Sequence, residues 1–420
     1  MEKRIIQVEE KVPAKMLIPL SIQHMFAMFG ATVTVPLLTG LNVQTTLLMA
    51  GLGTLLFHLL TKFKVPAFLG SSFAFLGGYA TVAPMAKDGS ANLEMLPYAC
   101  LGVVFAGLLY LVLALCIKLI GVSKVMKLFP PVVTGPIIIA IGLCLAPSAL
   151  NNCVTCWPLA IIALAIVIFF NILGKGMTKI IPILLGVVGA YLIALIFGNG
   201  FGVSWITPID TDSIAKAAWI GFPIDWNQTI FGGVDYADTA KITTALTTMI
   251  PIAIATMMEH IGDICAIGAT VGKDYINDPG LHRTLIGDGL ATSLSSLFGG
   301  PANTTYGENT GVLALSKVYD PRVVRIAAYI AIVFSFCPKF AAVINAMPMG
   351  IVGGISFILY GMIAAIGVRN VVEAGVDFQK SRNVIVSAVI FVCALGINFS
   401  DAGAATFTVD GVTISLSGLA

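Results

Sequence analysis

Charged residues are scarce in this chain of 420 residues: Asp, Glu, Lys and Arg make up 10% of it, whereas a soluble protein carries about 25%. The formal net charge is only +2, and no cluster of Lys or Arg alternates with aromatic residues. These absences exclude an ordinary soluble domain and a nucleic-acid-binding protein. Apolar residues make up 58% of the sequence, which is typical of a protein embedded in a lipid bilayer.

Signatures of enzymes and of metal sites are missing as well. Neither H-E-x-x-H nor G-x-S-x-G occurs, and none of the 4 histidines has an evident nucleophile partner, which argues against a membrane-embedded hydrolase. Cys153 and Cys156 form a C-x-x-C, but no histidine or second pair accompanies it, so we expect no metal there. We interpret this pair as unpaired loop cysteines, with a disulfide as the alternative.

Apolar stretches long enough to cross a hydrocarbon layer of about 30 Å recur along the chain. We expect thirteen such spans, at Met16–Leu38, Gln44–Leu60, Pro66–Ala83, Leu96–Ile120, Pro131–Ala146, Pro158–Leu173, Ile180–Phe197, Ile242–Ala269, Leu281–Phe298, Pro301–Ser316, Val323–Phe336, Pro348–Gly367 and Asn383–Ile397. A fourteenth begins near Ser415. Because the chain stops at Ala420, we expect this last span to be incomplete.

The distribution of basic residues predicts the orientation of these spans, because cationic loops remain on the cytoplasmic side. With the N-terminus inside, 19 of the 23 Lys and Arg residues lie in cytoplasmic segments; the exceptions are Lys87, Lys216, Lys241 and Lys339. A miscount by one span would destroy this separation. We therefore expect a multi-pass protein of the plasma (inner) membrane with a cytoplasmic N-terminus.

Four local patterns occur twice, in the same order, in the two halves of the chain. The matched pairs are Pro19…Gly30 with Pro251…Gly262, Thr46…Leu56 with Thr284…Leu294, Gly70–Phe73 with Asn303–Tyr306, and Pro130…Gly135 with Pro348…Gly353. Seven spans separate the copies, so the second copy must enter the membrane from the opposite side. The sequence thus predicts an inverted repeat, a design of many secondary transporters.

The third and tenth expected spans differ from the others. Both are short, are rich in Gly, Ser, Thr and Asn, and hold corresponding places in the two repeats. This pattern indicates interrupted segments that meet near the middle of the membrane. Their exposed backbone N–H groups can hold ligand oxygens, so residues 70–76 and 303–309 are the expected binding region.

Four carboxylates lie inside expected spans, namely Glu259, Asp263, Asp288 and Glu308. Each costs about 2.5–3.5 kcal/mol at the centre of a membrane helix and therefore needs a partner, a cavity or a proton. Glu259 and Asp263 share one helix face, about 6 Å apart, and two carboxylates so close in a low dielectric are not expected to be ionised together. This arrangement favours a proton carrier. For Asp288, a hydrogen bond between helices is an equal alternative.

Histidines and aromatic residues give weaker indications. His24 lies in the first span, where a hydrogen bond across the repeat interface explains it as well as a binding role does. His260 points away from Glu259 around the helix, which favours a structural role. Phe73 and Tyr306, in the broken segments, are candidates to stack on a planar ligand.

Several runs of residues resemble a known family, the nucleobase–ascorbate transporters, also called nucleobase:cation symporters of the second family. These runs are Gln23–Gly30, Gly70–Phe75, Asp278–Arg283 and Asn303–Gly311. The similarity extends over essentially the whole chain and is strongest to bacterial uracil permeases. It implies no enzymatic activity, but proton-coupled transport of uracil by alternating access, with no cofactor besides the coupling proton.

The resemblance also implies an architecture: an all-α polytopic fold of fourteen spans in two inverted repeats of seven, with short strands in spans 3 and 10. Residues 1–125 and 241–340 would form a core domain, and residues 126–240 and 341–420 a gate domain. The implied partners are uracil or a related nucleobase, protons and the bilayer. A homodimer is left open.

The site residues implied by the resemblance come from both domains. Glu259 would accept the N–H groups of the base and Glu308 would brace the site. Backbone near Phe73 and Gly307 would contact the base, Tyr306 would lie against it, and Ser72 belongs to the same segment. On the gate side the matching residues are Ser356 and Tyr360.

Proton coupling is implied for Asp263, Glu259, Asp288 and His24, but with one departure from the uracil permeases. Those proteins typically carry histidine where this chain has Asp263. Asp263 and Asp288 look like the purine-transporting branch, so a xanthine or uric acid permease is the alternative function. An anion transporter of the same fold is a further alternative, although Glu259 and Glu308 would repel an anion.

Overall fold

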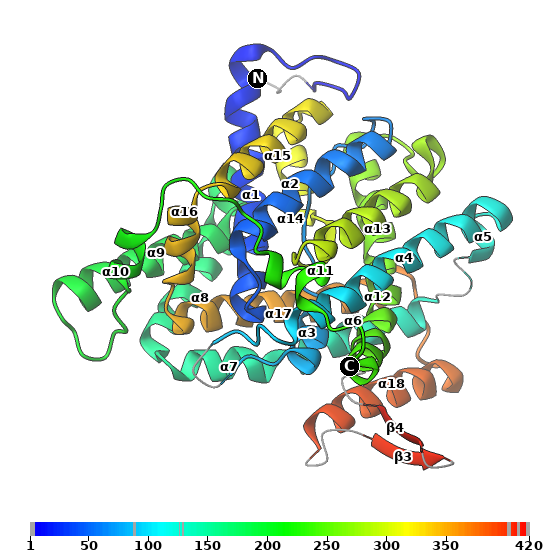
Figure 1. The fold of residues 1–420 in the computed structure, drawn as a ribbon. Coiled ribbons are helices and arrows are strands. Elements are labelled where there is room, and N and C mark those ends of the chain that lie inside the picture. The colour runs from blue at the N-terminus through cyan, green and yellow to red at the C-terminus, as the bar shows by residue number, and fades with distance from the viewer. Residues whose placement is uncertain are drawn as a thin grey trace.

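The computed structural model describes residues 5–86, 90–125, 127, 130–400, 405–409 and 412–416. The long helices are α1 (Ala14–Thr39), α2 (Val43–Leu60), α4 (Leu96–Ile120), α6 (Pro131–Cys144), α8 (Trp157–Leu173), α9 (Pro182–Ile193), α12 (Thr239–Val271), α13 (Leu281–Leu297), α15 (Pro321–Ser335), α17 (Met349–Glu373) and α18 (Ser381–Phe399). They form the helical bundle of Figure 1.

Shorter elements connect or interrupt these helices. The short helices are α3 (Leu76–Val82), α5 (Val122–Val125), α7 (Ala146–Val154), η2 (Gly176–Lys179), η3 (Ala194–Gly200), α10 (Thr211–Lys216), η4 (Trp226–Gln228), α11 (Ile230–Gly233), η5 (Ile276–Gly280), α14 (Gly307–Ser316) and α16 (Pro338–Asn345). The strands are β1 (Leu69–Ser71), β2 (Asn303–Thr305), β3 (Ala405–Val409) and β4 (Val412–Leu416).

Local sequence signals explain where several helices begin and end. The Asn42 side chain accepts hydrogen bonds from the backbone N–H groups of Gln44 and Thr45 and so caps α2. Asp238 caps α12 in the same way, through the N–H of Lys241. At its other end α12 stops at Gly272, whose φ of 76° is a conformation that glycine adopts without a steric penalty.

Seven helices in the described part of the chain are long and apolar enough to cross a membrane, and the number is eight if α15 and α16, bent by 86°, count as one span. These numbers are smaller than the thirteen expected spans, although a helix or a strand–helix pair lies at each expected position. The difference arises because α8, α13 and the interrupted segments are short. The expectation of an integral membrane protein that is mainly helical is confirmed.

The third and tenth expected spans are indeed interrupted. β1 is followed by α3, and β2 is followed by α14. The two strands pair with each other in antiparallel fashion, with Gly70 opposite Thr304. Segments far apart in the sequence are therefore joined at the middle of the fold.

The helices pack in two groups. α4 packs against α12 and α13, while α2 packs against α13 and α15, and α15 against α1. In the second group α17 packs against α6, α7 and α8, while α8 also contacts α9 and α18 contacts α6. The two groups meet where α1 contacts α9 and α12 contacts α6.

One expectation about the C-terminus is wrong. Ser415, where a fourteenth span was expected to begin, lies in β4, which pairs with β3 in a hairpin. Val412, Thr413 and Ile414 are β-branched residues, which are common in strands. Residues 417–420 and Lys87, one of the exceptions to the charge distribution, lie outside the described residues.

Candidate functional site

The crossing of β1 and β2 is held in place by threonines from neighbouring helices. On α2, the hydroxyl of Thr54 accepts a hydrogen bond from the backbone N–H of Leu69, at 2.9 Å. On α13, the hydroxyl of Thr292 donates to the carbonyl of Asn303, at 2.8 Å. These two threonines are paired in the internal repeat of the sequence. The strand ends are thus fixed from both halves of the chain.

A close contact between Gly70 and Tyr306 fixes the crossing further. A Cβ atom on Gly70 would lie 2.5 Å from Cζ of Tyr306, so no larger residue fits without a shift of the ring. The Tyr306 hydroxyl donates to the carbonyl of Ser71 at 3.0 Å and accepts from Thr32 on α1 at 3.2 Å. Tyr306 is 4% exposed. Its role is therefore partly to lock β2 onto β1.

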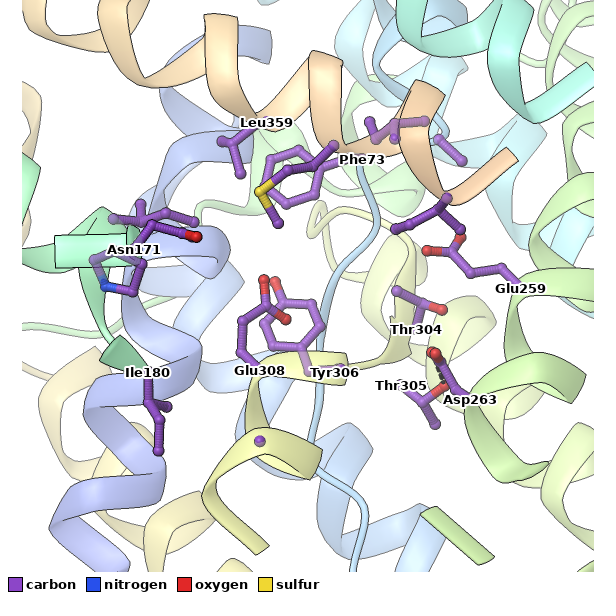
Figure 2. Close-up of a pocket in the computed structure, with 18 of the residues that line it drawn as sticks. Phe73, Asn171, Ile180, Glu259, Asp263, Thr304, Thr305, Tyr306, Glu308 and Leu359 are labelled. Carbon is purple, nitrogen blue, oxygen red and sulfur yellow. Dashed lines mark hydrogen bonds between the residues drawn. The ribbon is translucent and has the colours of Figure 1, made fainter. Parts of the chain in front are cut away.

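A cavity of about 680 Å³ lies between this crossing and the second helix group. Figure 2 shows Phe73, Glu308, Thr304 and Glu259 around one open space. The opposite wall is mostly apolar and comes from the second helix group: Ile138 and Ile141 of α6, Val167 of α8, and Leu359, Met362, Ile363 and Ile366 of α17. A mainly apolar cavity with a few convergent polar groups is typical of a small-molecule site.

Three carboxylates reach this cavity, those of Glu259 and Asp263 on α12 and of Glu308 in the first turn of α14. All three side chains are half-buried. Asp263 accepts a hydrogen bond from the hydroxyl of Thr305, at 2.8 Å. Within the described residues neither Glu259 nor Glu308 forms an ion pair. Both are available to a ligand in the cavity.

Behind the cavity wall lies a fully buried pair, His260 on α12 and Asp288 on α13. The ring nitrogen Nδ1 of His260 is 3.3 Å from Oδ2 of Asp288, and both side chains have 0% exposure. The hydroxyl of Thr305 lies 3.5 Å from the same ring nitrogen, so the pair is connected to Asp263. Asp288 itself does not line the cavity. Asp288 thus approaches His260 across the two helices, but among the described residues neither of its carboxylate oxygens has a hydrogen-bond partner, so the hydrogen bond between helices that was the alternative for Asp288 stays a prediction.

His24 is also buried, with 1% exposure, and does not line the cavity. The side-chain amide of Asn309 on α14 donates to the carbonyl of His24 at 3.0 Å and lies 3.1 Å from the His24 ring. This contact joins the first expected span to the tenth. A hydrogen bond across the two halves was one of the two expectations for His24, and it is observed.

Three further candidates lie beside the cavity but do not line it. Ser72 is 2% exposed and donates its backbone N–H to the carbonyl of Ala302. Ser356 is 0% exposed, and its hydroxyl donates to the carbonyl of Val352 one turn earlier in α17. Tyr360 is 3% exposed and packs in the apolar core of the second helix group. A direct contact of these side chains with a ligand stays a prediction.

Sequence reasoning missed part of the site. Thr304 and Thr305 line the cavity, and they were included only as members of a broken segment. Asn171 and Lys179 line it from the second helix group, where an isolated polar residue beside an apolar span gives no distinctive pattern. The apolar wall has no chemical signature in sequence at all, because such residues are equally common in packed cores.

The chemistry offered by the cavity combines donors and acceptors. α14 begins at Gly307, so the N–H groups of its first turn lack partners within the helix. A Cβ on Gly307 would meet no atom within 4 Å, which shows that this residue borders open space. Ionised carboxylates only accept hydrogen bonds, so Glu259 and Glu308 complement these donors. In the described chain no group of His, Cys, Asp and Glu could hold a metal ion, and Cys153 and Cys156 are free.

Comparisons with known proteins place this chain in a family. The profile of the Xan_ur_permease family, described as the permease family, matches residues 15–403. The uracil permease of Bacillus caldolyticus is 40% identical, with 99% of this chain and 93% of that protein covered. The uracil permease of Bacillus subtilis (strain 168) is 38% identical, with coverage of 94% and 89%. This chain therefore belongs to the permease family, whose members are transporters and not enzymes.

A solved structure shares the fold. The transmembrane domain of the cyanobacterial bicarbonate transporter BicA superposes with a TM-score of 0.64, covering 93% of this chain and 98% of that one, at 15% sequence identity. At this level of identity the likeness concerns the architecture alone. A transporter fold around a central cavity agrees with the membership of the permease family.

Proposed function

We propose that this protein is a proton-coupled uracil symporter. The observation that carries the proposal is the cavity at the β1–β2 crossing, which is lined by the carboxylates of Glu259 and Glu308 and by Gly307 at the start of α14. Uracil permeases among the relatives support this choice of substrate. The cavity volume of about 680 Å³ lies within the range of small-molecule sites.

The proposed recognition matches the edge of a flat, neutral base. Uracil presents N–H donors and C=O acceptors in one plane, so Glu259 accepts from the ring N–H groups and backbone N–H groups near Gly307 donate to a carbonyl. Phe73 lies at the cavity and packs against the ring face. Glu308, half-buried in the first turn of α14, braces this arrangement and benefits from the helix dipole.

Proton coupling is assigned to the carboxylates on α12. Asp263 is open to the cavity, where protons and substrate arrive together, and its bond to Thr305 ties it to the strand that bears Thr304. Protonation of Asp263 removes a negative charge close to Glu259, so it favours a state in which Glu259 remains ionised and binds the base. Asp288 and His260 extend this network away from the cavity.

The transport cycle is assigned to a motion between the two helix groups, the core (residues 1–125 and 241–340) and the gate (126–240 and 341–420). The cavity is bounded by both groups, which suits alternating access. It extends along α14 to Leu315, close to Lys317, whose carbonyl accepts a hydrogen bond from Ile6 of the N-terminal segment. With a cytoplasmic N-terminus in the inner membrane, the cavity is open inward.

The inverted repeat belongs to the same proposal. It is supported by the equivalent positions of β1 and β2 and by the matched threonines Thr54 and Thr292 that hold them. Two copies of opposite orientation give a fold that opens to either side by similar motions.

Uptake of labelled base into proteoliposomes tests the proposal. We expect uracil to accumulate when a pH gradient, acidic outside, is imposed, and to equilibrate slowly without it. Accumulation of labelled xanthine instead of uracil would identify a purine permease. Bicarbonate tests the anion alternative, which three carboxylates in the cavity disfavour. Absence of uracil uptake under both conditions would refute the proposal.

A further inference from the structure

The outer face of α4 carries an exposed apolar stripe. Leu108, Val112, Leu115 and Leu119 are spaced at helical intervals and are 39%, 56%, 55% and 73% exposed. Side chains at such spacings lie on one helix face. In a membrane protein this face is covered by lipid acyl chains, and it ends beside Lys118.

A second cavity lies where this stripe ends. It measures about 360 Å³ and lies among the ends of α2, α4 and α13, which run side by side with α13 in the middle (Figure 1). Its lining consists of Leu60, Leu111, Ala114, Leu115, Lys118, His282, Arg283 and Ile286. Leu115 belongs to both the stripe and the cavity, so the two are continuous.

The charge of this cavity is positive and is not compensated. Its lining residues include Lys118, His282 and Arg283 and no acid. In the part of the chain that the structure describes, neither Lys118 nor Arg283 forms an ion pair. The guanidinium of Arg283 donates one hydrogen bond, to the carbonyl of Leu60 at 3.3 Å, and retains its other donors.

Asp278, four residues before His282, is engaged elsewhere. Its carboxylate pairs with Lys64, with 2.6 Å between Nζ and Oδ1. Lys62 also adds its positive charge to the field around His282. An anion entering the cavity would therefore meet basic groups from α4 and α13 and from the end of α2.

We propose that this cavity binds the phosphate group of an anionic phospholipid, whose acyl chains lie along the α4 stripe. Basic pockets between membrane helices at the cytoplasmic side are suited to anionic headgroups. Arg283 provides paired donors for a phosphate and Lys118 a flexible point charge. The continuity of cavity and stripe favours a lipid over a free anion, because only a lipid fills both.

Lipid-specific quenching tests this site directly. In a background whose 4 native tryptophans are replaced by phenylalanine, Leu119→Trp places a single reporter on the stripe beside the cavity. We expect phosphatidylglycerol with brominated acyl chains, titrated into detergent-solubilised protein, to quench this tryptophan at lower concentration than brominated phosphatidylcholine. Free inorganic phosphate should not displace the brominated lipid at millimolar concentration.

Charge removal supplies the second arm of the test. Each basic group near an anionic headgroup contributes about a fivefold gain in affinity, so the double change K118Q and R283Q should weaken phosphatidylglycerol binding roughly 25-fold. Lys175→Gln removes an exposed charge on the other helix group and serves as the matched control. The conservative change K118R should retain binding, and retained uracil binding verifies the fold.

The outcomes separate the lipid site from its rivals. Equal quenching by the two lipids, or unchanged binding in the double variant, would overturn the proposal. Displacement by inorganic phosphate would show a site for a soluble anion instead. If Arg283 only caps α2, R283Q will lower thermal stability equally in both lipids without altering the quenching preference, which also contradicts the proposal.

Discussion

Thr305 and Asp263 connect the strand crossing to the carboxylate pair: the Thr305 hydroxyl donates to Oδ2 of Asp263 across 2.8 Å. Thr305 stands opposite Leu69 in the β1–β2 pair, so this bond joins α12 to both interrupted segments. A change in the charge of Asp263 therefore acts on the same strand that lines the cavity. This relationship gives the proposed coupling a physical route.

Asp263→Asn should separate transport from the pH gradient. The amide oxygen still accepts from Thr305, so the fold and uracil binding should be kept, but the amide takes up no proton at physiological pH. We expect uracil accumulation driven by a pH gradient to fall at least tenfold, while exchange of labelled for unlabelled uracil continues. Asp212→Asn, an exposed change outside the cavity, is the control. Accumulation that still follows the gradient would contradict the assignment.

Glu259→Gln should abolish uracil binding. The amide presents donors where the proposed recognition needs only acceptors, and loss of a charged hydrogen-bond partner weakens affinity on the order of 100-fold. Thermal stabilisation of the detergent-solubilised protein by uracil measures the effect. Glu373→Gln, on the exposed end of α17, should leave that stabilisation unchanged. Stabilisation of the Glu259 variant equal to that of the wild type would be inconsistent with the site.

Three glycine-to-alanine changes distinguish the cavity from its support. A Cβ on Gly307 or on Gly396 meets no atom within 4 Å, whereas one on Gly70 would lie 2.5 Å from Tyr306. Gly307→Ala should keep the melting temperature and weaken uracil binding, because the new methyl group enters the cavity. Gly396→Ala, on α18, which contributes no residue to the cavity lining, should keep both.

Gly70→Ala should lower thermal stability by about 1–3 kcal/mol, because overpacking forces the Tyr306 ring to move. Thermal melts with and without uracil measure all three variants. A Gly70 variant as stable as the wild type would mean that the ring yields without cost.

Asp320 should couple stability to pH. It caps α15 through the N–H of Arg322 and accepts a hydrogen bond from the N–H of Val12 at 3.1 Å, so it attaches the N-terminal segment to the bundle. Burial alone would raise the pKa of the Asp320 carboxyl, but the hydrogen bonds from Arg322 and Val12 hold that pKa below its ordinary value. A lowered pKa stabilises the fold above the unfolded value of about 3.9, and this contribution is lost as the pH falls through the folded pKa.

Asp320→Ala should therefore cost about 1 kcal/mol at pH 7, the usual value of a helix cap. The difference in melting temperature between wild type and variant should be constant from pH 8 to pH 5 and shrink below pH 4. Asp320→Asn keeps the cap and should lose less. A difference that does not change down to pH 3.5 would contradict the role of the charge.

Much of this fold could be predicted from the sequence, because lipid leaves few options to the backbone. The apolar stretches mark helices such as α4 and α12 within a few residues. The abundance of Gly, Ser, Thr and Asn at residues 70–76 and 303–309 indicated interrupted spans, and both contain a strand. The hairpin at β3 and β4 was missed because five apolar or small residues in a row fit a helix as well as a strand.

The site could be predicted only in part. Carboxylates in apolar spans are conspicuous, so Glu259, Asp263 and Glu308 were found, and all three reach the cavity. Side-chain direction is less visible in a sequence. Ser356 and Tyr360 lie on a side of α17 that is buried against neighbouring helices, whereas Leu359 and Met362 lie on the side that lines the cavity. A helix that is apolar on every side gives no period from which to choose.

The bond between Tyr306 and Ser71 joins residues 235 positions apart. When the first helices have been synthesised and inserted into the bilayer, only β1 of the strand crossing is present. Its partner β2 follows after more than two hundred further residues have been synthesised. Until then the polar residues around Gly70 must be sheltered by water, lipid headgroups or the insertion machinery. Assembly of the binding site therefore cannot be completed until β2 has been synthesised and has paired with β1.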